Sequence, residues 1–158
     1  MREATFALEG AIERPGPWGR ERLLRELASE IRSVDYVVKG ERRNASAVPL
    51  LSLIQAARPK LNPRAKNHLL AFSVFVRAND GYTMSFSLGE MSPTEGKRAV
   101  WVAFERSGKP ILGDDGPVEI LVPDDSRPAR FVHGVSRIIV VDGLALTDPK
   151  NRKVPGIG

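Results

Sequence analysis

The side chains best suited to chemistry in this sequence are cations that gather in one segment. Residues 39–66 contain seven basic side chains and a single acid, Glu41. A local excess of positive charge attracts anionic ligands. The segment therefore indicates a surface for an anionic partner, and the alternative interpretation is a solvated face without a ligand.

Other reactive groups are sparse. The chain has no cysteine, which excludes disulfides, thiolate ligands and cysteine nucleophiles. Its two histidines, His68 and His133, lack a third ligand at a recognisable spacing, so we expect structural roles for both. Asp114-Asp115-Gly116 and Asp124-Asp125-Ser126 resemble fragments of calcium loops, but ordinary turn chemistry explains them better. We predict no catalytic residue and no metal ligand.

Composition narrows the class of partner. A net charge of +5 and a pI near 9.9 are compatible with nucleic-acid binding. Only 6% of the residues are aromatic, and Trp101 and Phe104 stand among apolar neighbours where we expect core packing, so nucleic acid is not the predicted partner. The longest apolar run, 69–76, is too short to span a bilayer. An anionic small molecule or a protein partner remains, and the sequence leaves the oligomeric state open.

The elements that must position these groups are mostly strands. Apolar positions at three- and four-residue spacing predict helices over 20–32 and 50–57, and 88–91 is expected to form one helical turn. Short apolar or alternating runs predict strands over 5–12, 34–39, 69–77, 82–87, 100–104, 118–123 and 135–141. This order predicts an α+β fold with mixed or antiparallel sheets and two or three short helices in the first half.

Turn residues and composition also suggest the domain limits. Pro15-Gly16-Pro17 and Asn79-Asp80-Gly81 predict turns, the second in a hairpin. The 158 residues suit one domain, which we place at 1–142. Residues 143–158 are rich in Pro, Gly and charge, so we expect a loosely held tail. The N-terminus lacks the pattern of a signal peptide.

Several segments, taken in order, resemble one known family. Ala47–Ile54 is similar to a Gly-Val-Pro-Leu helix entry, and Asp80-Gly81-Tyr82 to an Asp-Gly-Tyr hairpin. Residues 108–117 contain two turns between strands, similar to Gly-x-Pro-Leu and Gly-Gly-Pro, and 130–138 resembles a closing Lys-Trp-Val and Arg-Ile strand. Together the segments cover about residues 5–141. They resemble the sulfite-oxidase-type oxidoreductase molybdopterin-binding domain.

The resemblance implies the fold of that domain and the position of its cofactor. Molybdopterin has a phosphate and a polar ring, which need cationic donors. The candidate cofactor-binding residues are Arg42, Arg43, Arg127 and Arg130, the last in place of a family lysine. The alternative interpretation is that these are surface arginines paired with nearby acids, namely Glu41, Asp124 and Asp125.

One departure from the family concerns the metal. Catalytic relatives hold molybdenum through a cysteine thiolate, and Val38 occupies the corresponding position here. Molybdopterin is therefore a cofactor suggested by resemblance only. Three functions follow in order of preference: a molybdopterin-binding-like domain without molybdenum catalysis that binds a pterin or another anionic small molecule, a noncatalytic protein-interaction module, and a molybdenum oxidoreductase with a noncysteine ligand. The resemblance implies an exported or periplasmic protein if a signal peptide was removed, and a cytoplasmic one otherwise.

Overall fold

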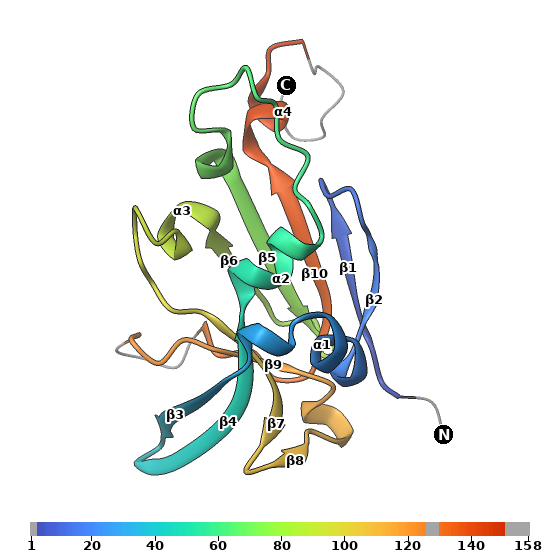
Figure 1. Ribbon diagram of the computed structural model, residues 1–158, viewed down its shortest axis with the longest axis vertical. Helices are drawn as coiled ribbons and strands as arrows, with labels where there is room; N and C mark the ends of the chain where they lie inside the picture. Colours follow the sequence, from blue (N-terminus) through green and yellow to red (C-terminus); the bar gives the residue numbers. More distant parts are fainter. Residues whose placement is uncertain (1–2, 126–129, 151–158) are drawn as a thin grey trace.

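Two five-stranded β-sheets, placed one above the other along the long axis, form the fold (Figure 1). The computed structural model describes residues 3–125 and 130–150. The strand order is β2-β1-β10-β5-β6 in the first sheet and β3-β4-β7-β8 in the second, where β9 pairs with β7. All pairs are antiparallel except β1 with β10. The predicted α+β class with mixed sheets is confirmed.

The first sheet combines strands from both ends of the chain with a hairpin from its middle. Its members are β1 (Phe6–Gly10), β2 (Gly16–Trp18), β5 (Phe72–Ala78), β6 (Thr83–Ser87) and β10 (Val135–Asp142). The second sheet is built from the middle of the chain. Its members are β3 (Arg32–Val38), β4 (Glu41–Pro49), β7 (Trp101–Arg106), β8 (Lys109–Pro110) and β9 (Glu119–Leu121).

The helices are short and lie between or beside the sheets (Figure 1). They are α1 (Arg20–Glu26), α2 (Leu50–Ala56), α3 (Leu88–Met91) and α4 (Gly143–Thr147), with 3-10 turns at Ala28–Glu30, His68–Ala71 and Gly113–Asp115. Within the described ranges, none of the helices combines the length and apolar character needed to cross a membrane.

The second sheet is apolar on both faces. One face contributes Val48, Val102 and Phe104 to the main core, which also contains the inner face of the first sheet together with α1 and α2. The opposite face has a smaller cluster that includes Tyr36 and Ala103. Since side chains alternate along a strand, one sheet can contribute to both clusters.

Two local predictions were wrong, and one strand was missed. The helix expected over 20–32 ends at Glu26, and extended backbone resumes at Ile31. Gly16 and Pro17, expected in a turn with Pro15, belong to β2, which pairs with β1. Strand β4 was not predicted, because the short side chains of Ala45 and Ala47 and the arginines before them hide its alternation.

Residues beyond 142 begin with helix α4. Asp142 caps this helix, since its carboxylate accepts hydrogen bonds from the backbone N–H groups of Leu144 and Ala145. The rest of the expected tail, 151–158, lies outside the described residues.

Gly10, at the end of β1, tests how closely the parallel strands β1 and β10 are packed, and Gly40 in the β3–β4 turn serves as its control. At Gly10 (φ 102°) an added Cβ would collide with the carbonyl oxygen of Val140, whereas at Gly40 (φ 79°) it would meet nothing. We expect Gly10→Ala to lower the free energy of unfolding by about 3 kcal/mol and Gly40→Ala, the control, by about 1 kcal/mol. Urea unfolding measures both values. Equal losses would contradict the close approach of β1 and β10.

Candidate functional site

A cavity of about 680 Å³ opens beside the hairpin formed by β3 and β4. We call it the hairpin pocket. Its lining comes from three places: Asp35, Tyr36 and Val37 of β3; Arg42, Arg43 and Asn44 of β4; and Arg106 with Ser107 at the end of β7. This volume falls within the usual range for small-ligand sites, about 300–1,000 Å³.

The hairpin turn determines which side chains meet at the pocket. Lys39 and Gly40 form a two-residue turn, and both have positive φ, as in a type I′ turn. Such a turn fixes the register, so that Arg42 lies opposite Val37 and Asn44 opposite Asp35. The Asn44 amide donates a hydrogen bond of 2.8 Å to the Asp35 carboxylate. The carboxylate of Asp35 is thereby held by Asn44, and both residues line the same cavity as the arginines.

The structure brings two of the four predicted arginines together. Arg42 and Arg43 share the hairpin pocket with Arg106, against one acidic lining residue, Asp35. The Arg43 guanidinium lies 3.5 Å from the Glu41 carboxylate, an exposed pair that contributes little. Arg42 is exposed. In the described part of the chain no ion pair includes its guanidinium, which can therefore bind a ligand without breaking one.

A fully buried carboxylate, Glu119, holds the third arginine. It accepts hydrogen bonds from Arg106 Nη2 at 2.9 Å, from His133 Nδ1 at 2.6 Å and from the Tyr36 hydroxyl at 3.3 Å. Arg106 also lies 3.6 Å from Asp115. Removing a carboxylate from water costs several kcal/mol, and these three donors offset that cost. The guanidinium of Arg106 is therefore fixed where it borders the pocket.

The pKa shifts follow from this arrangement. Burial alone would raise the pKa of Glu119, but the hydrogen bonds from His133 and Arg106 outweigh it, and the net shift is downward. The hydrogen bond to Glu119 raises the pKa of His133 despite partial burial. Burial and the charge of Glu119 raise the pKa of Tyr36. The cluster therefore favours an ionised Glu119 and a protonated His133 over a shared pH range.

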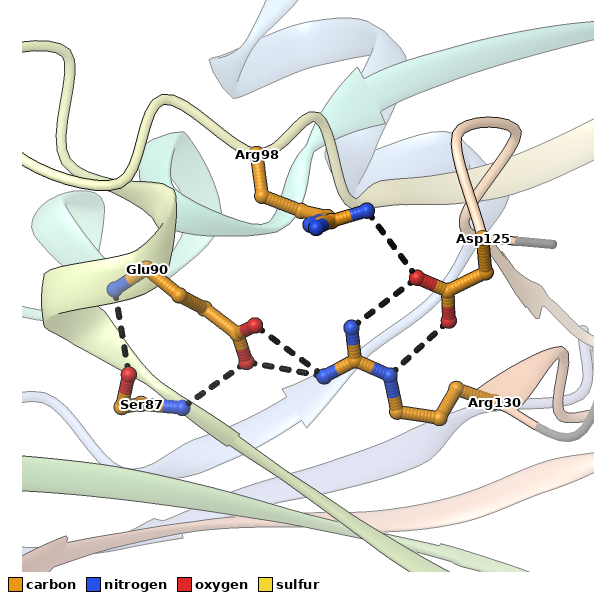
Figure 2. A network of polar contacts seen from close by, with 5 residues as sticks. All are labelled: Ser87, Glu90, Arg98, Asp125 and Arg130. Atoms are coloured by element: carbon orange, nitrogen blue, oxygen red, sulfur yellow. Dashed lines mark hydrogen bonds and ion pairs between the residues drawn. The ribbon is translucent and has the colours of Figure 1, made fainter.

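Arg130 lies in a different network, which Figure 2 shows. Its Nε and Nη2 donate to Asp125 at 2.9 and 3.1 Å, and its Nη1 donates to both carboxylate oxygens of Glu90, the closer at 2.9 Å. Arg98 donates to the same Asp125 at 3.2 Å. All three guanidinium nitrogens of Arg130 are therefore bonded to protein carboxylates, and the pKa of Asp125 is held below its usual value chiefly by Arg130.

The same network is anchored to the first sheet. Ser87 caps α3 reciprocally: its hydroxyl accepts from the Glu90 N–H at 3.0 Å, and its own N–H donates to the Glu90 carboxylate at 3.2 Å. The Arg130 guanidinium lies 4.8 Å from the centre of the Phe86 ring. Arg130 thus joins α3 to the segment that contains Asp125. The fourth predicted arginine, Arg127, lies outside the described residues.

Each histidine is hydrogen-bonded to a carboxylate of the protein. His68 is buried; its Nδ1 accepts the backbone N–H of Asn62 at 2.8 Å, so its Nε2 donates to Asp142 at 2.9 Å. His133 is bonded to Glu119. Among the described residues, no group of three or more His, Asp or Glu side chains is arranged to hold a metal ion.

Sequence reasoning missed Arg106 and Glu119 as parts of the site. Glu119 could have been noticed, because it interrupts the apolar strand Val118–Val122 with one charge. Such a residue is almost never fully buried without partners. Its partner Arg106 is separated by 13 residues, and only the register of β9 and β4 on β7 brings the two to one face.

Comparisons with known proteins inform the fold. No family model matches the chain, and no curated protein matches it. A solved structure, the sulfane dehydrogenase SoxCD from Paracoccus pantotrophus, is similar with a TM-score of 0.63 and 18% sequence identity. The match covers 87% of this chain and 38% of that chain. At this identity the likeness shows a shared fold alone.

His133 allows a test of the buried cluster by pH. Its folded-state pKa is raised, so the pair with Glu119 stabilises the fold fully below the ordinary histidine value of 6.5, and this contribution is lost as the pH rises through the raised value. The pKa of Glu119 is lowered, so its ionised form stabilises the fold fully above the ordinary glutamate pKa of 4.5. This stabilisation is lost only as the pH falls through the lowered pKa. We expect His133→Gln to lower the free energy of unfolding by about 1 kcal/mol between pH 4.5 and pH 6.5, and by less at higher pH. The expected loss is small because 48% of the His133 side chain is exposed to solvent, which screens the pair.

Urea unfolding across this pH range measures the difference, and NMR titration of His133 gives its pKa directly. Asp115 and Arg106, which also act on His133, are present in both proteins. In a Glu119→Gln background the extra cost at low pH should disappear. A cost that does not change with pH would contradict the proposed pair.

Proposed function

We propose that this chain is a molybdopterin-domain-like protein that binds a pterin phosphate or another anionic small molecule at the hairpin pocket, without molybdenum catalysis. The observation that supports the proposal is that three arginines, Arg42, Arg43 and Arg106, line one cavity. An arginine can donate two parallel hydrogen bonds to a phosphate, and Arg42 has no competing ion pair in the described part of the chain, whereas Arg106 is already bonded to Glu119.

The three arginines offer different contributions to binding. Arg106 is already held by Glu119, so a ligand loses little side-chain entropy when it binds there. Arg42 is exposed and adds a charge that can close over the ligand. The pair between Arg43 and Glu41 is long, at 3.5 Å, and can rearrange at low cost. We therefore assign the main phosphate contact to Arg42, supported by the positive charge of Arg106, which keeps its pairs with Glu119 and Asp115.

A molybdenum ion held as in the resembled family does not fit these residues. That coordination needs a thiolate, and the sequence has none. Val38, which takes the place of the family cysteine, packs partly against the smaller apolar cluster and has no lone pair to offer a metal. We therefore propose no chemical step through molybdenum. Stoichiometric molybdenum with turnover in natively expressed protein would contradict this part of the proposal.

Arg127 and Arg130 have a secondary place in the proposal. A ligand that binds Arg130 must displace Asp125 or Glu90 from its guanidinium, which loses charge-assisted hydrogen bonds. The likeness to a sulfane dehydrogenase supports the fold that the proposal assumes. The activity in that protein's name is not transferred, because the match covers a minor part of it.

Arg42→Ala tests the proposal. Loss of a charge-assisted contact should weaken the binding of a pterin monophosphate by about tenfold, because such a hydrogen bond contributes about 1.5–3 kcal/mol. Pterin fluorescence measures the dissociation constant. Arg25→Ala is a matched control, since Arg25 is 68% exposed on α1 and does not line the pocket. The same pterin without its phosphate should bind wild type weakly and be insensitive to Arg42→Ala.

Two results would overturn the proposal. One is a wild-type protein that does not bind the pterin monophosphate or inorganic pyrophosphate at millimolar concentration. The other is equal affinity in wild type and in a variant with both Arg42→Ala and Arg43→Ala, since the pocket would then have no part in binding.

A further inference from the structure

A second cavity, of about 570 Å³, lies between α2, the end of α3 and the start of β7. None of the arginines assigned to the hairpin pocket lines it. Its walls are largely apolar and include Leu51, Met91 and Trp101. Ser52 and Gln55 of α2 add neutral donors, Lys97 and Arg98 add cations, and none of the lining residues is acidic. We call it the Trp101 pocket.

The charge of the Trp101 pocket depends on the network in Figure 2. There, the guanidinium groups of Arg98 and Arg130 are balanced by the carboxylates of Asp125 and Glu90. Lys97 lines the same cavity, and no ion pair in the described part of the chain includes it. The ammonium group of Lys97 is thus the cation that a ligand can neutralise.

The backbone around Lys97 is fastened in place. Lys97 has a φ of 56°, which a residue with a side chain rarely adopts. Two hydrogen bonds hold this conformation: Lys97 N–H donates to Ser92 O at 2.9 Å, and Arg98 N–H donates to Glu90 O at 2.7 Å. A strained residue that is held at the rim of a cavity is a recurrent feature of binding sites. The rim is therefore organised before a ligand arrives.

We propose that the Trp101 pocket binds a flat apolar ring that bears a carboxylate. The ring lies against Trp101, whose face favours offset stacking with another aromatic ring, and contacts Leu51 and Met91. The carboxylate pairs with Lys97 and accepts from Gln55 or Ser52. The cavity suits a small molecule in volume, and this site is separate in residues and in ligand chemistry from the phosphate site at the hairpin pocket.

NMR titration with naphthoate tests the assignment. The protein has two tryptophans, so Trp101→Phe identifies the Trp101 indole resonance. Naphthoate should shift this resonance in a saturable manner, and naphthalenemethanol, which has the ring without the carboxylate, should bind at least about tenfold more weakly. Lys97→Glu should weaken naphthoate by a similar factor, because it replaces attraction with repulsion, and Lys97→Arg should restore binding.

The controls separate this site from the hairpin pocket. Lys109→Glu makes the same charge change at an exposed residue of β8 outside the Trp101 pocket and should leave naphthoate affinity within about twofold. Arg42→Ala should also leave it unchanged, so the two proposals can fail independently. Equal affinities for naphthoate and naphthalenemethanol, or an unchanged affinity in Lys97→Glu, would overturn the assignment. So would saturation without a shift of the Trp101 resonance.

Discussion

The second sheet depends on a carboxylate that has no access to solvent. Glu119 lies on the face of that sheet opposite the main core, and its three donors come from β3, from the end of β7 and from the segment before β10. An unpaired carboxylate there would cost several kcal/mol, so the three contributors must stay together if the face is to stay closed. The smaller apolar cluster, which includes Tyr36 and Ala103, lies on the same face.

The same interaction links the core to the hairpin pocket. Arg106 has one side toward Glu119 and borders the cavity on the other, so its position does not depend on a ligand. A surface arginine would have to give up rotamer freedom on binding, which costs about 0.5–1.5 kcal/mol for each immobilised side chain. Since the fold has already ordered Arg106, an anion at the proposed site would gain from a charge that the protein core holds in place.

Local sequence patterns were sufficient to predict some elements, and they failed where the pairing of distant strands decides the structure. The hairpin of β5 and β6, helix α2 and strand β10 were predicted because each has its own turn residues or apolar period. Strand β4 was missed because its burial comes from alanines, and α1 was predicted too long because Leu27 and Ile31 continue the helical spacing in sequence while the backbone turns between them. Of the site, Arg42 and Arg43 could be proposed from local charge. Arg106 and Glu119 could not be paired, because the register that joins them is a property of three strands.

Arg130 and Arg42 show that residue type alone does not define a binding group. Both side chains can hold a phosphate, and sequence reasoning treated them alike. Arg130 is enclosed by Glu90 and Asp125, which already occupy the positions that phosphate oxygens would take, so it joins α3 to its neighbour. Arg42 stands at a hairpin whose facing residue is Val37, which cannot accept a hydrogen bond from it through its side chain. The difference lies in what the fold places opposite each guanidinium, and it favours the hairpin over the Arg130 network as the place where an anion from solution can bind.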